Sequence, residues 1–200
     1  MKILSPLHAE SRVSWLADTA SACLIDEARL SPKPGLVDSR GSGAHQDLTL
    51  ALMERSARSL QPTFHALAQQ SWRRPADIAL RETVGRLGRE GEAQMMQATG
   101  GVNTHRGAIW ALGLLVSAVA MLGSGSFTGD RRHRRRPRPS ARRPAPKSFS
   151  KGLRASRRWQ VPGAREEAQR GFPHITTPRC RSYSKAAPGA PASRRRNLTR

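Results

Sequence analysis

The stretch VSWLADTASACLIDEARL, residues 13–30, decides the fold class. Its apolar side chains recur three and four positions apart, which is the spacing of one buried face of an α-helix. Pro32 and Pro34 follow and end the helix, because proline has no N–H and restricts the residue before it. Ser11 or Ser14 is predicted to cap the start. The predicted buried face consists of Val13, Leu16, Ala17, Ala20, Leu24 and Ala28.

Helical spacing continues as far as Gly123, and no segment alternates with the period of a strand. We therefore predict an all-α fold for residues 1–123. Pro62 and Pro75 are expected in the first turns of two helices, where proline is tolerated. The further helices are predicted at about residues 46–60, 63–70, 76–97 and from Thr104 or His105 to 122. The inward side chains are expected to be Leu48, Leu52, Leu60, Ile78, Val84, Leu87 and Met95.

Three features bear on the cellular compartment. The longest apolar stretch, Ala108 to Leu122, falls short of the roughly 18–20 residues that a membrane span needs, so a buried helix is the better interpretation. Residues 1–10 contain no apolar run typical of a signal peptide. Cys23 lies among apolar residues of a predicted helix and is interpreted as a small buried thiol. The two cysteines of the chain have no paired spacing, so neither a disulfide framework nor a zinc site is expected. A soluble cytoplasmic protein, with no membrane partner, is the resulting expectation.

The formal charge of +21 is unevenly distributed along the chain. Residues 1–123 carry 13 lysines and arginines against 11 aspartates and glutamates, whereas residues 124–200 carry 22 against 3. The second segment also holds nine prolines and only two leucines. Because it can bury little apolar surface, we predict a largely disordered Arg/Pro-rich tail. The predicted domains are thus residues 1–123 and 124–200.

The first segment suited to chemistry is PKPGLVD, residues 32–38, followed by GAHQD, residues 43–47. Lys33 is a candidate phosphate ligand, and Gly35 permits a tight bend. Asp38 and Asp47 are candidate ligands of Mg²⁺, which prefers oxygen atoms. The alternative is that Asp47 caps a helix and that Lys33 is a solvated charge.

The second segment is TGGVNTHRG, residues 99–107, which leads into the apolar helix. Gly100 and Gly101 would let a ligand approach the backbone, and the N-terminus of the next helix favours an anion. Arg106 would add a forked contact to phosphate oxygens. Alternatively, this is a glycine turn in which Asn103 or Thr104 caps the helix.

A third segment lies inside the basic tail, GAREEAQRGFPH at residues 163–174. A short helix from Ala164 to Arg170, closed by Gly171 and Pro173, is predicted there. Taken alone, this segment is better interpreted as an isolated surface turn than as a functional element.

Together, the three segments resemble the triphosphoribosyl-dephospho-CoA synthase family. The resemblance is carried by Glu27, residues 32–38, Gly43, His45, Asp47, residues 99–107, and the island at residues 161–175. It implies a soluble all-α enzyme, of which residues 1–123 are the helical N-terminal part. It also implies transfer of the triphosphoribosyl group of ATP to the ribose 2′-hydroxyl of 3′-dephospho-CoA, with release of adenine.

The resemblance further implies that the matching residues lie near the substrates. Phosphate and substrate binding is then expected from Lys33, Gly35, Gly100, Gly101, Asn103, Thr104, Arg106 and Arg165. Candidate catalytic groups are Asp38, His45, Asp47 and His105, and candidate Mg²⁺ ligands are Glu27, Asp38 and Asp47. The product would pass to a holo-acyl-carrier-protein synthase serving malonate decarboxylase or citrate lyase.

The tail departs from the family pattern. The family's helices are not evident between Gly123 and Trp159, and its later Asp-Thr-Asn segment is absent. We interpret this composition as that of a gene read partly out of frame after about Gly123. One alternative is therefore that the chain is a remnant of this enzyme that performs the reaction poorly or not at all. A nucleic-acid-binding protein is a weaker alternative, because the tail lacks interleaved aromatic residues and a known nucleic-acid fold.

Overall fold

The computed structural model of the protein describes residues 6–123, 158 and 164–172. Within this part of the chain all regular structure is helical, apart from a single bridge between Asp38 and Gly41. The all-α prediction is therefore confirmed for the described residues. The first unit contains α1 (Pro6–Arg29), α2 (Leu50–Ser59), α3 (Gln61–Ser71), α4 (Ile78–Ala98) and α5 (Arg106–Leu122), and the second contains α7 (Ala164–Gln169).

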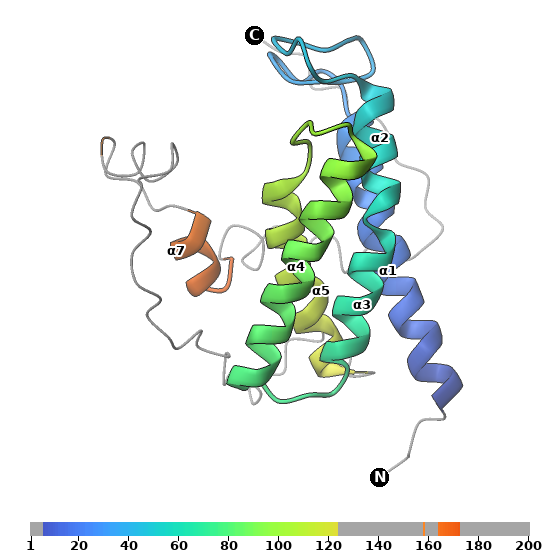
Figure 1. The fold of residues 1–200 in the computed structure, drawn as a ribbon, viewed down its shortest axis with the longest axis vertical. Coiled ribbons are helices and arrows are strands. Elements are labelled where there is room, and N and C mark those ends of the chain that lie inside the picture. Colours follow the sequence, from blue (N-terminus) through green and yellow to red (C-terminus); the bar gives the residue numbers. More distant parts are fainter. Residues whose placement is uncertain (1–5, 124–157, 159–163, 173–200) are drawn as a thin grey trace, which may run out of the picture. The chain divides into compact units, whose positions relative to one another are not determined.

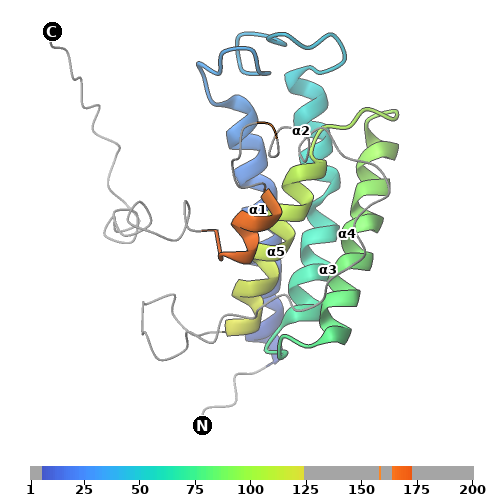
Figure 2. The same cartoon turned by 90° about the vertical axis from the view of Figure 1, so that its left-hand side faces the viewer.

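The helices of the first unit form an up-and-down bundle (Figure 1). Helix α1 runs up, α2 and α3 descend one after the other, α4 returns, and α5 descends again. The loop after α1 and the turn between α4 and α5 therefore lie at the same end of the bundle, as Figure 2 also shows. Helix α3 packs against α1, α4 and α5. This topology brings two candidate segments together although they are far apart in sequence.

The core is built from the apolar faces that the spacing predicted. Leu60 and Met95 are fully buried, whereas Leu48, Leu52, Val84 and Leu87 are half-buried. At the crossing of α3 and α4 the helices approach so closely that a Cβ atom on Gly91 would lie 2.5 Å from Cγ2 of Thr63. The main buried cluster comprises Val13, Ala17, Ala20, Leu24, Ala57, Leu60, Phe64, Leu67, Ala68, Met95, Ile109, Val116 and Ala120.

The start of α1 differs from the prediction. The helix begins at Pro6, in agreement with the tolerance of proline at the first helical position. Ser11 and Ser14 lie inside α1, so the prediction that one of them caps it is wrong. The helix ends at Arg29, before Pro32, as the proline rule predicted.

Whereas α1 begins earlier than predicted, two other helices begin later. Helix α2 begins at Leu50, where Thr49 Oγ1 accepts a hydrogen bond from the N–H of Leu52, so residues 46–48 belong to the loop. Helix α4 is capped by Asp77, whose Oδ1 accepts a hydrogen bond from the N–H of Leu80 at 2.7 Å. Pro75 therefore precedes the first turn, whereas Pro62 lies in the first turn of α3 as predicted.

Two side chains point away from the core against expectation. Ile78 is 67% exposed, and Leu80 takes the inward position instead. Cys23 is exposed rather than buried. Each helical residue is rotated by about 100° from the one before it, so Cys23 faces away from the buried side that Leu24 occupies. No helix in the described ranges is long and apolar enough to cross a membrane.

The second unit is described at residue 158 and at residues 164–172. Helix α7 ends where predicted, because Gly171 has a φ of 77° and its N–H donates to the carbonyl of Ala168. The N–H of Phe172 donates to the carbonyl of Glu167, which completes a glycine-based helix end. The predicted short helix is confirmed. Arg165 lies in this helix, but its side chain, like Pro173 and most of the predicted disordered tail, lies outside the described residues.

Candidate active site

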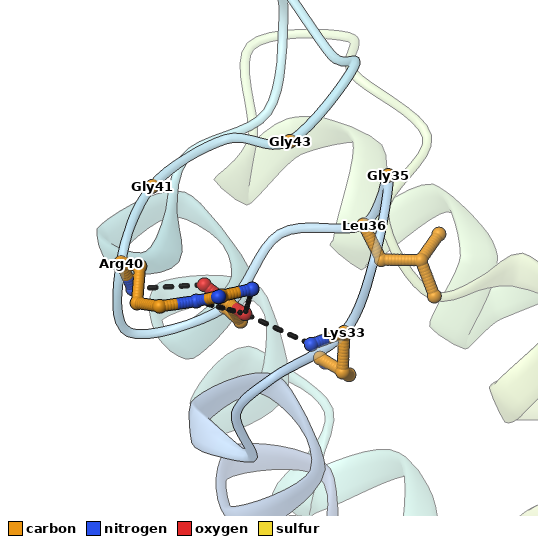
Figure 3. Close-up of a pocket in the computed structure, with 7 residues that line it drawn as sticks. Lys33, Gly35, Leu36, Arg40, Gly41 and Gly43 are labelled. Carbon is orange, nitrogen blue, oxygen red and sulfur yellow. Dashed lines mark hydrogen bonds and ion pairs between the residues drawn. The ribbon is translucent and has the colours of Figure 1, made fainter.

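The loop between α1 and α2 folds back on itself around a small hollow (Figure 3). Asp38 and Gly41 exchange two backbone hydrogen bonds of 3.0 and 3.2 Å, and the N–H of Ala44 donates to the carbonyl of Gly35. Gly43 has a φ of 59°, and a Cβ atom there would lie 2.5 Å from the carbonyl oxygen of Leu36. Only glycine fits such a position. The hollow measures about 260 Å³ and is lined by Lys33, Gly35, Leu36, Asp38, Arg40, Gly41 and Gly43.

The carboxylate of Asp38 lies under this loop and is only 3% exposed. Its Oδ1 accepts the N–H of Arg40 at 2.8 Å, and its Oδ2 accepts the N–H of Lys33 at 2.9 Å. The Arg40 guanidinium adds Nε and Nη2 to Oδ2 at 3.0 and 2.8 Å. The Arg40 side chain, followed by these backbone N–H groups, holds the pKa of Asp38 well below its usual range. Such a carboxylate is a poor proton acceptor.

Lys33 ties the loop to the last turn of α1. Its Nζ atom donates to the carbonyl oxygen of Glu27 at 2.6 Å and to Glu27 Oε1 at 3.0 Å. The Lys33 side chain is 12% exposed, whereas that of Glu27 is 56% exposed. A cation at the C-terminus of a helix meets carbonyl groups without helical partners, so this contact also stabilises the end of α1.

The turn between α4 and α5 begins with a helix end of the same kind as that of α7. The N–H of Gly101 donates to the carbonyl of Met96 at 2.7 Å, and the N–H of Gly100 donates to that of Gln97 at 3.4 Å. Gly100 has a φ of 65°, the left-handed conformation that this motif requires. Both N–H groups are therefore occupied in the helix end. The close approach of a phosphate to Gly100 and Gly101 stays a prediction.

His105 lies in the interior where this turn meets α2. The residue is 4% exposed, and its Nδ1 lies 2.9 Å from the Oγ of the fully buried Ser56. The same Oγ lies 2.6 Å from Oγ1 of Thr104. The other ring nitrogen, Nε2, is buried and has no hydrogen-bond partner among the residues that the structure describes. A buried polar atom without a partner is uncommon and calls for an explanation.

Glu27 connects the two candidate segments. It accepts the Lys33 ammonium, and its negative charge also acts on the imidazole of His105. Burial lowers the pKa of His105, and the charge of Glu27 opposes that shift without overcoming it. His105 is thus held mainly neutral near pH 7, and its Nδ1 faces the hydroxyl of Ser56.

The remaining residues of the second segment serve the start of α5. The Oδ1 of Asn103 accepts the N–H of Arg106 at 3.3 Å, so Asn103 acts near the predicted cap position. The Nε of Arg106 is paired with Oε1 of Glu92 on α4. The Arg106 side chain is 57% exposed, so its outer nitrogens remain accessible to solvent.

The predicted Mg²⁺ ligands do not form a ready-made site. The described part of the chain holds no group of three or more His, Cys, Asp or Glu side chains placed to bind a metal ion. Glu27 is paired with Lys33, and both oxygens of Asp38 accept N–H groups. Asp47 is 69% exposed, and its nearest recorded partner is His45 Nδ1 at 3.9 Å. Asp47 is therefore the predicted acid with the most accessible oxygens.

Three residues at this end of the bundle escaped the sequence analysis. Ser56 holds His105, and Arg40 holds Asp38. Glu54 binds the guanidinium groups of Arg29 and Arg58 at 2.6 and 2.8 Å, which lowers its pKa, with the Arg29 hydrogen bond as the main cause. The sequence did contain a signal for the burial of Ser56. This residue lies four positions after Leu52 and four before Leu60, on the helix face that was predicted to point inward.

Comparison with known proteins identifies the family. The profile of the CitG family, described as ATP:dephospho-CoA triphosphoribosyl transferase, matches residues 13–198. The chain belongs to the CitG family. The match is wider than the resemblance found in the sequence, because it continues through the basic tail. The hypothesis of a partly shifted reading frame stays a prediction that only the gene sequence tests.

Several CitG-type relatives are closely similar. A 2-(5''-triphosphoribosyl)-3'-dephosphocoenzyme-A synthase from Klebsiella pneumoniae is 84% identical over 182 residues, which cover 88% of this chain and 63% of that protein. Proteins named as probable synthases of this kind are 54% identical in Stutzerimonas stutzeri and 55% identical in Azotobacter vinelandii, covering 61% and 60% of their lengths. The chain thus spans about three fifths of these relatives. No solved structure matches this CitG-family chain.

Proposed function

We propose that the protein is a triphosphoribosyl transferase that joins the triphosphoribosyl group of ATP to 3′-dephospho-CoA. The 2′-oxygen of dephospho-CoA forms a bond to ribose C1′ of ATP, while the bond from C1′ to adenine breaks. The hydroxyl loses its proton, and adenine leaves as the neutral base. Family membership and the names of the relatives support this reaction class.

One observation of the fold supports the proposal most directly. Glu27 contacts Lys33 in the first candidate segment, and its charge acts on His105 in the second. Two of the three segments that carry the family resemblance therefore lie at one end of the bundle (Figure 1 and Figure 2). A reaction between two anionic substrates needs cations and a proton carrier within one such region.

We assign the proton transfer to His105. Its imidazole is neutral near pH 7, its Nδ1 is held by Ser56, and its buried Nε2 has no partner in the described residues. A neutral, oriented imidazole is a suitable general base or acid near neutral pH. Glu27 would stabilise the imidazolium that forms when Nε2 takes a proton. His45 and Asp47 are accessible, and we assign them to substrate contacts at the rim.

Magnesium is proposed as part of the ATP substrate. Mg²⁺ typically binds through one or two carboxylates together with substrate phosphates and water, so a three-carboxylate site is not required. Asp47 is the acid that we expect to approach it, because its oxygens are the most accessible. Downstream, we expect the product to be used by an enzyme that attaches this group to an acyl carrier protein.

The test measures adenine release by the purified full chain supplied with ATP, Mg²⁺ and 3′-dephospho-CoA. We expect release that depends on both substrates and that falls at least about 100-fold in His105→Gln, the scale of a lost general acid–base. The matched control is His65→Gln, which removes an imidazole on α3. No adenine release from the unaltered, folded chain would overturn the proposed activity and favour the inactive remnant.

A further inference from the structure

We propose that Arg40, oriented by Asp38, is the oligophosphate-binding residue of the hollow in the α1–α2 loop. This inference rests on the proposed function, which supplies two candidate ligands, the triphosphate of ATP and the diphosphate of dephospho-CoA. It assigns a role to Arg40, which the sequence motifs did not single out. It also makes Asp38 a positioning residue rather than a base or metal ligand.

In the ion pair between Arg40 and Asp38, the guanidinium faces the solvent and the carboxylate is buried. The Asp38 side chain is 3% exposed, whereas that of Arg40 is 62% exposed. Figure 3 shows the guanidinium reaching across the hollow from the side opposite Lys33. An anion that arrives from solvent therefore meets the guanidinium first, and the carboxylate lies behind it.

Enough hydrogen-bond donors remain at the hollow to bind phosphate oxygens. A guanidinium carries five N–H groups, and only Nε and Nη2 of Arg40 are directed at Asp38. The backbone N–H groups of Gly35 and Gly43, which line the same hollow, make no hydrogen bond within the described residues. Arginine and free backbone N–H groups are the usual ligands of phosphate groups.

Asp38 holds both the Arg40 guanidinium and the backbone of the loop in position. Its Oδ2 binds the side chain of Arg40 and the N–H of Lys33 together, and its backbone pairs with Gly41 across the turn. An arginine that is held in one orientation loses less conformational entropy when it binds. Because both carboxylate oxygens accept N–H groups and the side chain is 3% exposed, we assign Asp38 to positioning Arg40 rather than to metal binding or proton transfer.

The experiment uses inorganic tripolyphosphate as the probe and amide hydrogen exchange of the full chain as the readout. We expect the probe to slow exchange in residues 33–45 of the unaltered protein, and the protection to disappear in Arg40→Gln. Arg12→Gln is the matched control, because it removes an exposed arginine about 25 Å along α1 from the end that carries the loop. Protection confined to residues 124–200, or equal protection in Arg40→Gln, would overturn the inference.

Two further variants separate charge from geometry and folding. Arg40→Lys keeps the positive charge but loses the forked N–H donors of the guanidinium. We therefore expect tripolyphosphate to bind at least threefold more weakly than to the unaltered protein. Asp38→Asn is expected to weaken binding although it removes a negative charge, because the guanidinium is no longer held. Binding that becomes tighter in Asp38→Asn would contradict the positioning role.

The steady-state constants distinguish the two ligands and separate this inference from the proposed function. A rise of at least tenfold in KM for ATP alone in Arg40→Gln would assign the hollow to the triphosphate, and the same rise for dephospho-CoA alone would assign it to the diphosphate. Normal adenine release with neither KM changed would overturn the inference while the proposed function stands. Arg40-dependent protection without adenine release would overturn the proposed function and leave an oligophosphate site.

Discussion

The Nδ1 atom of His105 lies 2.9 Å from the Oγ atom of Ser56, which lies in turn 2.6 Å from Oγ1 of Thr104. Ser56→Ala removes the atom that both partners share, in a fully buried position. We expect the free energy of unfolding to fall by about 1–3 kcal/mol, because buried polar atoms lose their partner. Urea denaturation measures this change. Ser59→Ala is the control, since Ser59 Oγ donates a hydrogen bond to the carbonyl of Ser56 within its own helix. An equal loss in both variants would contradict the role of Ser56.

The lowered pKa of His105 predicts how stability depends on pH. An unfolded histidine takes up a proton near pH 6.5, at about its ordinary pKa, whereas burial makes the folded imidazole resist protonation. Below that pH the unfolded state binds more protons, so we expect the free energy of unfolding to decrease as the pH falls from about 7.5 to 5.5. His105→Gln should flatten this decrease. An unchanged slope in the variant, or an NMR titration of His105 above its ordinary pKa, would show the assignment to be wrong.

The loop around the hollow should depend on Gly43 more than on Gly35. Both have positive φ, of 59° and 76°, so an alanine at either position carries a backbone cost of about 1–2 kcal/mol. At Gly43 the new Cβ atom would also collide with the backbone of Leu36, whereas at Gly35 it meets no atom within 4 Å. We expect Gly43→Ala to accelerate amide exchange at Ala44, whose N–H bonds to the carbonyl of Gly35, far more than Gly35→Ala does. Similar acceleration in both would argue against this loop geometry.

Helix α4 offers a matched pair of glycine substitutions. In Gly91→Ala the new Cβ atom would lie 2.5 Å from Cγ2 of Thr63, so we expect a destabilisation of about 1–3 kcal/mol from overpacking. Gly88→Ala meets no atom within 4 Å and should stabilise the protein by about 0.5–1 kcal/mol through helix propensity. Urea unfolding at pH 7 compares the two. Stabilisation by both substitutions would mean that α3 and α4 are further apart than described.

Local sequence signals predicted the helices better than their ends. Pro62 and the Gly100-Gly101 pair marked real boundaries, because the conformational limits of proline and the left-handed φ of glycine act within one turn. The start of α1 was predicted too late, because Ser11 and Ser14 are polar residues that a helix interior also accepts on its solvent side. The start of α2 was predicted too early. Thr49 rather than a residue near Gln46 caps α2, and this choice depends on where the loop returns to the bundle.

The sequence alone determined the all-α class, the buried face of α1, the two breaks in the chain and the segments that carry the family resemblance. These features follow from spacing and backbone preference, which act over a few residues. Only the tertiary structure decided that Arg40 engages Asp38, that Ser56 holds His105, and that the charge of Glu27, which binds Lys33, also acts on His105. Helical periodicity defines which residues share a face, but not which distant group meets that face. For Ser56 and His105 that choice is made when the bundle packs, because packing brings the serine of α2 within hydrogen-bond distance of the residue that precedes α5.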